Sequence, residues 1–396
     1  MGRRGPMLTL AAALLVSACA APPDTTWVRS SDPALARMAG ELLPALAAKA
    51  NLALTEPVRV EWRSREELER YLRVKVDEEL PVARAQALSD AYGLLGLFPA
   101  PVDLRALLLD VHLEQVAGFY DPDSTALFVM REQPEAMTRT ILVHELVHAI
   151  QDQTTSLDSI TARERGTDRQ TAAQAAIEGH ATLVMLEFMA EGMRGEPLDL
   201  STVTDFQGRI RPLLEQARTQ YPALASAPRV IQESLLYPYL AGAGFVQALW
   251  QAQGGRPAPF GRDLPQSTEQ VDDPARFVGE RDDPTALALT APGVEIRIED
   301  ELGQLGTRIL LEERAGTMAG AAARGWDGDR FLLWEQGGQS GLVWATVWDD
   351  PAARDAFLDT LAGGEWALEA RTVSDRPVAI VRIGAEPPSG VELSVP

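Results

Sequence analysis

Two histidines and a glutamate stand at a spacing that can build a metal site: His144, Glu145 and His148. Residues four apart share one face of a helix, so both imidazoles can reach one ion. The carboxylate between them then lies beside the ion and can accept a proton from a water molecule. In a chain of 396 residues with only 4 histidines, this pattern predicts a Zn²⁺ site with Glu145 as general base.

A catalytic zinc ion usually takes three protein ligands, so the motif predicts one more ligand elsewhere. The stretch Glu178-Gly179-His180, on a second predicted helix over residues 168–191, offers two candidates. Residues two apart on a helix point in opposing directions, so only one of them is expected to bind. We favour Glu178, because Gly179 would let the two helices approach closely and because alanines surround the carboxylate. His180 stays a candidate for a supporting position.

Three other polar residues are candidates for roles around the metal. Tyr237 and Tyr239 lie on a predicted helix over residues 229–253 and could donate a hydrogen bond to a substrate oxygen, although both could equally be core tyrosines. Asp152 follows His148 by one turn, so it is a candidate either to orient a ligand or to end the helix.

The first residues predict an export signal. Arg3 and Arg4 precede an apolar stretch, residues 8–16, that is too short to cross a membrane as a stable helix. Small residues then lead to Cys19, the only cysteine, in a pattern that resembles the cleavage site of bacterial lipoproteins. We expect residues 1–18 to be removed and Cys19 to carry lipid. The protein would then be anchored in a bacterial cell envelope, facing the periplasm or the exterior.

The formal net charge of the chain is −21. A surface this acidic argues against binding nucleic acid, and it would repel anionic lipid headgroups. Membrane association is therefore expected only through the lipid on Cys19. The partner that the metal chemistry suggests is a peptide or protein substrate.

The hydropathy pattern predicts an α+β protein. A tether over residues 19–31 leads to a mainly helical domain over residues 32–290, and residues 291–396 are predicted to form a smaller α+β domain on an antiparallel sheet. Just before the metal motif, two apolar runs flank Asp121-Pro122-Asp123 and predict a β-hairpin. Pro134 can then open the helix that carries the histidines.

Longer stretches around the metal residues resemble a known group of enzymes. Residues 141–153 and 176–182 are similar to the gluzincin-like zinc metallopeptidases, and more closely to an uncharacterised bacterial family of secreted or lipid-anchored zincin-like proteins. The similarity continues through residues 118–122, 237–239, 244–246, 267–270 and 325–329, so it covers most of the mature chain.

This resemblance implies zinc held by His144, His148 and Glu178, with Glu145 as the base for hydrolysis of a peptide bond. It also implies that the hairpin strand over residues 125–130 is an edge on which an extended peptide could pair. In many gluzincins an aspartate four residues after the glutamate ligand orients a zinc histidine, but here that position is Thr182. The residue with this orienting role is therefore left open.

Two other functions are compatible with the sequence. One is a catalytically inactive zinc-binding lipoprotein that uses its C-terminal tryptophans, Trp326, Trp334, Trp344 and Trp348, to bind a partner as a scaffold. Glu145 argues against it, since a structural zinc site has no use for that carboxylate. The other is a metal-dependent hydrolase of a different bond, because zinc and Glu145 define the mechanism more tightly than the substrate.

Overall fold

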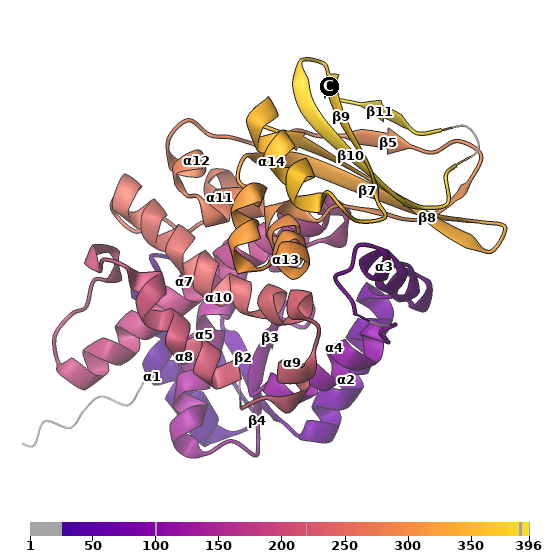
Figure 1. Ribbon diagram of the computed structural model, residues 1–396. Helices are drawn as coiled ribbons and strands as arrows, with labels where there is room; N and C mark the ends of the chain where they lie inside the picture. Colours follow the sequence, from indigo (N-terminus) through magenta and orange to yellow (C-terminus); the bar gives the residue numbers. More distant parts are fainter. Residues whose placement is uncertain (1–25, 100, 219, 388–389, 396) are drawn as a thin grey trace, which may run out of the picture.

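The computed structural model describes residues 26–99, 101–218, 220–387 and 390–395, and it shows the α+β protein that the sequence predicts (Figure 1). The predicted export signal and Cys19 lie outside the described residues. Among the helices of the described part, none combines the length and the apolar character that a membrane crossing requires.

A four-stranded sheet forms the base of the N-terminal part, with strand order β1-β2-β4-β3. Strands β1, β2 and β4 run parallel, and β3 pairs antiparallel with β4 at the edge, so the predicted hairpin is present. The strands are β1 (Val28–Arg29), β2 (Val58–Arg63), β3 (Gly118–Asp121) and β4 (Ala126–Met130). Strand β1 lies within the stretch over residues 19–31 that we expected to form a tether.

Helices surround this sheet and make up most of the N-terminal part. They are α1 (Pro33–Ala50), α2 (Arg65–Glu79), α3 (Val82–Leu94), α4 (Leu104–Gln115), α5 (Glu135–Asp152), α6 (Leu157–Ile160), α7 (Thr167–Arg194), α8 (Phe206–Arg218), α9 (Pro222–Ser226), α10 (Arg229–Gln253), α11 (Thr268–Asp272) and α12 (Ala275–Val278), with short 3₁₀ turns η1 (Arg163–Arg165), η2 (Leu200–Thr202) and η3 (Gly261–Asp263). The short helices α6, α9, α11 and α12 were not predicted, because four or five residues carry too little periodicity to detect.

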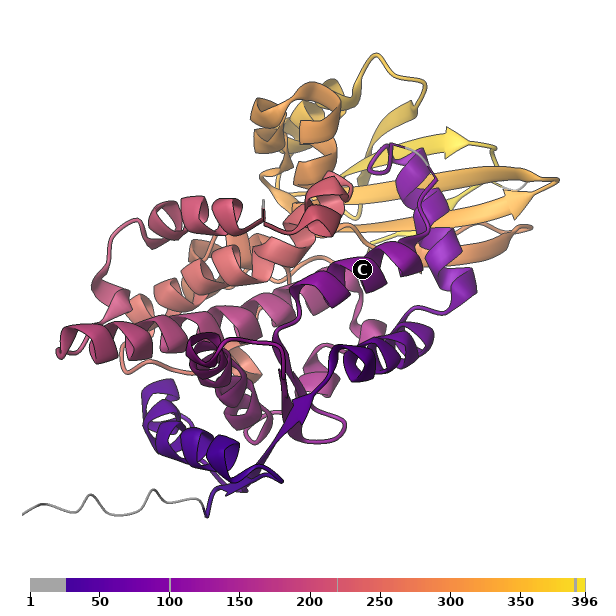
Figure 2. The same ribbon diagram turned by 90° about the horizontal axis from the view of Figure 1, so that it is seen from below.

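Two long helices, α7 and α10, pack along one another between the N-terminal sheet and the C-terminal part (Figures 1 and 2). Their closest crossing is at Gly179 and Gly242. A Cβ atom on Gly179 would lie 2.1 Å from the carbonyl carbon of Gly242, and one on Gly242 would lie 2.0 Å from the carbonyl oxygen of Ala175. We expected Gly179 to allow a close approach of the helix that carries the metal motif. The helix that approaches it closely is α10.

The C-terminal part is built on a five-stranded antiparallel sheet of order β6-β7-β8-β10-β9. Its elements are β5 (Ala288–Thr290), β6 (Glu295–Asp300), α13 (Gly303–Ala315), η4 (Thr317–Ala323), β7 (Trp326–Gln336), β8 (Gln339–Trp348), α14 (Pro351–Leu361), β9 (Ala367–Val373), β10 (Arg376–Gly384) and β11 (Glu392–Ser394). Alternate residues of β7 enter two different cores: Phe331 packs in the core shared with α13 and α14, and Leu332 packs against β5. Both faces of the sheet are therefore covered.

The four C-terminal tryptophans are part of these cores. Trp326, Trp334, Trp344 and Trp348 are each at most 2% exposed. The idea that they form a surface for binding a partner is therefore wrong, since folding has already buried their rings.

Candidate metal centre

The metal residues come from two helices that pack on each other, α5 and α7. Helix α5 begins directly after Pro134, as predicted, with Pro134 as its N-cap residue at φ −58° and ψ 145°. His144 and His148 lie one turn apart on the face of α5 turned toward α7, where Glu178 meets them. The structure therefore brings the three predicted ligands together.

The ligand atoms converge on one point. The two Nε2 atoms of His144 and His148 are 3.0 Å apart, and the Glu178 Oε2 atom lies 3.1 Å from the first and 3.4 Å from the second. Ligands at about 2.0–2.1 Å from a tetrahedral zinc ion lie about 3.3 Å from one another. The residues therefore fit a zinc ion in both chemistry and spacing, and they are the group of the described residues that could hold a metal ion.

The charges of the group suit a cation. Burial lowers the pKa of His148, but the neighbouring Glu178 carboxylate outweighs burial and, with Glu145, raises this pKa to about 9. Burial acts to raise the pKa of Glu178, but the two imidazoles hold that pKa well below its usual range. Without a metal, the carboxylate therefore favours protonation of His148, and a divalent cation can replace that proton.

Glu145 is held beside the ligands by the edge strand β3. The backbone N–H of Tyr120 donates to the Glu145 Oε2 atom at 3.0 Å. Strand β3 can come this close because Gly118 has no side chain: a Cβ atom there would lie 2.4 Å from Ile141 Cγ2 and 3.7 Å from Glu145 Cγ. The carboxylate of the predicted base is thus oriented by backbone.

The edge of the sheet that faces the site is β3 and not the strand over residues 125–130 that the sequence suggested. Strand β4 pairs with β2 on one side and β3 on the other, so its own hydrogen-bonding groups are used within the sheet. Beside the site, an extended peptide could therefore pair with β3 and not with β4.

The two candidate tyrosines of α10 have different surroundings. The ring of Tyr239 lies 6.2 Å from the ring of His144. The charge of Glu178, followed by burial, raises the pKa of the Tyr239 hydroxyl well above its usual value, so this hydroxyl keeps its proton. Tyr237 is buried and donates to the carbonyl oxygen of Thr268 at 3.0 Å, which makes it a core residue. Tyr239 and Gly242 are three residues apart on one face of α10. The close approach of α10 to α7 at Gly242 therefore places Tyr239 near the metal group.

Asp152 and His180 do not contact the ligand atoms. Asp152 accepts from the Tyr120 hydroxyl at 2.8 Å and from the Leu157 N–H at 2.9 Å, so it joins β3 to the start of α6. Burial lowers the pKa of His180 to about 4, and its Nδ1 atom lies 3.0 Å from Gln151 Nε2. Sequence reasoning missed Gln151, which also contacts His148. Its position three residues after His148 was the signal that could have found it.

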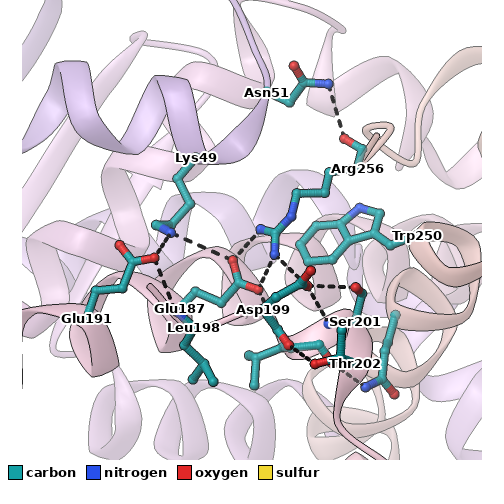
Figure 3. Close-up of polar contacts among 12 residues, drawn as sticks. Lys49, Asn51, Glu187, Glu191, Leu198, Asp199, Ser201, Thr202, Trp250 and Arg256 are labelled. Carbon is teal, nitrogen blue, oxygen red and sulfur yellow. Dashed lines mark hydrogen bonds and ion pairs between the residues drawn. The ribbon is translucent and has the colours of Figure 1, made fainter. Parts of the chain in front are cut away.

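Another carboxylate on α7, that of Glu187, lies in a different polar cluster (Figure 3). The Glu187 side chain is 0% exposed, and both its oxygens accept from the guanidinium of Arg256, which stacks on Trp250. The Leu200 N–H also donates to it at 2.7 Å, and Lys49 Nζ lies 3.9 Å away. This cluster joins α7 to the ends of α1 and α10.

Comparison with known proteins reaches only the C-terminal part. Residues 293–387 match the model of a family described as a domain of unknown function, DUF8575. No curated protein and no solved structure matches the chain. The metal group lies outside the matched segment, so its interpretation depends on its own geometry.

Proposed function

We propose that this protein is a zinc-dependent peptidase anchored in a bacterial cell envelope. The observation that carries the proposal is the convergence of His144 Nε2, His148 Nε2 and Glu178 Oε2 within 3.0–3.4 Å of one another, with Glu145 beside them. A site built only to stabilise the fold would need no further carboxylate next to its ligands.

When bound, zinc supplies a Lewis acid that makes water more acidic and polarises a carbonyl group. The residues of the chain would do the rest. Glu145, oriented by the Tyr120 N–H, accepts the proton of the attacking water and returns it to the leaving amine. Tyr239 keeps its proton and lies on the side of His144, where it can donate to the oxygen that gains charge.

Anchoring and domain organisation are parts of the same proposal. Lipid on Cys19 would hold the protein at a membrane, with the peptidase region over residues 32–290 and a C-terminal region over residues 291–396. The anionic chain supports a lipid anchor over a basic membrane-binding face, since the net charge is −21.

The test compares the native protein with Glu145→Gln, which has nearly the same shape but cannot act as a base. We expect about one zinc ion per chain in both proteins and hydrolysis of a mixed peptide library by the native protein only, with a loss of about 10²–10⁴-fold in the variant. Zinc in both proteins with no hydrolysis by either would favour the inactive zinc-binding lipoprotein. Absence of zinc from the native protein would refute the proposal.

Tyr239→Phe separates the role of the tyrosine from that of the base. It should lower kcat more than KM and leave the zinc content unchanged, because the hydroxyl acts on charge that develops during the reaction. Tyr237→Phe is the matched control on the same helix, and it should affect stability without selectively lowering kcat.

A further inference from the structure

A buried amide lies directly behind the metal group. Gln151 is 0% exposed and stands three residues after His148 on α5. Its Oε1 atom lies 2.8 Å from His148 Nδ1. Its Nε2 atom lies 3.0 Å from the carbonyl oxygen of Ile177 and 3.0 Å from His180 Nδ1. All of these partners are in the interior, so no solvent exchange compensates for a lost bond.

The carbonyl of Ile177 determines how this amide is oriented. A carbonyl oxygen can only accept, so the amide group that faces it must be the NH₂. The Oε1 atom then faces His148, and an oxygen can only accept as well. His148 Nδ1 must therefore carry the hydrogen, which leaves the lone pair on Nε2. That lone pair is the one directed at the metal group.

The second hydrogen of the amide makes a further contact with helix α7. It points to His180 Nδ1, which accepts it, and His180 is itself 0% exposed. Ile177 and His180 lie on either side of Glu178 in α7. Gln151 thus contacts a ligand on α5 and, on α7, the residues that flank the third ligand.

We infer that Gln151 is the positioning residue of the metal centre: it selects the tautomer of His148 and sets the spacing between His148 and Glu178, with His180 holding the amide in place. It performs the role that Thr182 leaves open. The inference rests on the proposed function for the presence of a metal, but it concerns metal binding and does not depend on the substrate. Because the amide is neutral, it orients the imidazole without adding a charge to the site.

Metal affinity is the direct test. Full-length protein is stripped of metal and titrated with Zn²⁺ against a chromophoric chelator, and the visible spectrum of the Co²⁺-loaded protein is recorded. Gln151→Leu should bind Zn²⁺ about 10–100-fold more weakly and show an altered Co²⁺ spectrum. Gln151→Glu restores an acceptor for His148 but places an oxygen against the Ile177 carbonyl, so its affinity should be higher than that of Gln151→Leu.

A second variant tests the inference if Gln151→Leu does not fold, and a third serves as the control. His180→Phe preserves a ring against Trp250 and Phe260 but removes the acceptor, so affinity should fall toward the lower end of the range, about tenfold. Gln153→Leu is the control: this glutamine bonds Thr55 and Glu56 away from the metal, and its loss should leave both affinity and spectrum unchanged.

The outcomes separate the inference from the function beneath it. Native affinity and spectrum in Gln151→Leu, or native affinity in His180→Phe, would overturn the inference while leaving the peptidase proposal intact. Lower thermal stability of the metal-free variants with unchanged affinity would show a purely structural role and would overturn it too. Failure of the native protein to bind Zn²⁺ would refute the proposed function itself.

Discussion

Two of the glutamates on helix α7 have carboxylates with contrasting surroundings. Glu187 is fully buried, and its negative charge is paired with two cations of the chain, Arg256 and Lys49. Glu178 faces two imidazoles, and in the described part of the chain the structure gives it no lysine or arginine partner. A lysine or arginine partner makes a buried carboxylate part of the structure, whereas a carboxylate paired with an imidazole can exchange the proton of that imidazole for a divalent cation.

Removing the internal cation should have the largest effect on stability. Arg256→Met leaves Glu187 buried without its main partner, so we expect the free energy of unfolding of the metal-free protein to fall by about 3–5 kcal/mol. Urea denaturation measures it. The folded variant should still bind Zn²⁺ with native affinity, and a weakened metal site would show that the two clusters are coupled.

Removing the metal carboxylate should reverse this pattern. Glu178→Gln should lower the Zn²⁺ affinity by more than the roughly 100-fold that marks the loss of a supporting residue, because a ligand itself is lost. Chelator competition measures this affinity. Metal-free stability should fall less than in Arg256→Met, since an amide can still bond to the imidazoles; an equal fall would refute the distinction between the two glutamates.

Separating α7 from α10 at their crossing should lower both stability and activity. Gly242→Ala places a methyl group where a Cβ atom would lie 2.0 Å from the carbonyl oxygen of Ala175. The helices must separate, at a cost of about 1–3 kcal/mol in the free energy of unfolding. Because Tyr239 moves with α10, kcat should fall while Zn²⁺ affinity stays near native. Gly192→Ala on α7, where a Cβ atom meets nothing within 4 Å, is the control that should be tolerated.

A last expected effect is on the dependence of stability on pH, to which His148 of the metal cluster contributes. Glu178 outweighs burial and raises the pKa of His148 in the folded protein to about 9, above the unfolded value of about 6.5. Protonated His148 therefore stabilises the metal-free protein fully below about pH 6.5, and this contribution is lost as the pH rises through about 9.

Zn²⁺ binding should depend on pH with the opposite sign, because the ion competes with that proton and its affinity rises up to about pH 9. Urea unfolding with a chelator and with Zn²⁺, at several pH values, compares the two slopes. His148→Gln should reduce the slope of the metal-free curve between about pH 6.5 and 9. Parallel slopes for the metal-free and zinc-loaded protein would contradict this account.

Local patterns in the sequence predicted the parts of the site that depend on one helix. The spacing of His144 and His148 is a property of helix geometry, and Pro134 marks where that helix begins. Glu178 was favoured over His180 from its alanine neighbours, and the structure places Glu178 at the imidazoles. The fold class was predicted because the α5 and α7 patterns are long and the C-terminal strands are strongly apolar.

What the sequence did not reveal are relations between distant segments. Gly179 signalled a close approach, but nothing local says that its partner is Gly242 rather than α5. The choice of Tyr239 over Tyr237 follows from the direction of one face of α10. Strand β1 has two residues and is recognisable only through its pairing with β2. Burial of the tryptophans likewise depends on helices and strands that cover them from elsewhere in the chain.

His144 and Glu178 are separated by only 34 residues of sequence. An ion that joins them closes a short loop, and short loops lose little chain entropy on closure. All three candidate ligands lie on α5 and α7, which precede α8 and α10 in the chain. The candidate metal group is thus complete without the segment that carries Tyr239, so the two parts of the proposed site are separable along the sequence.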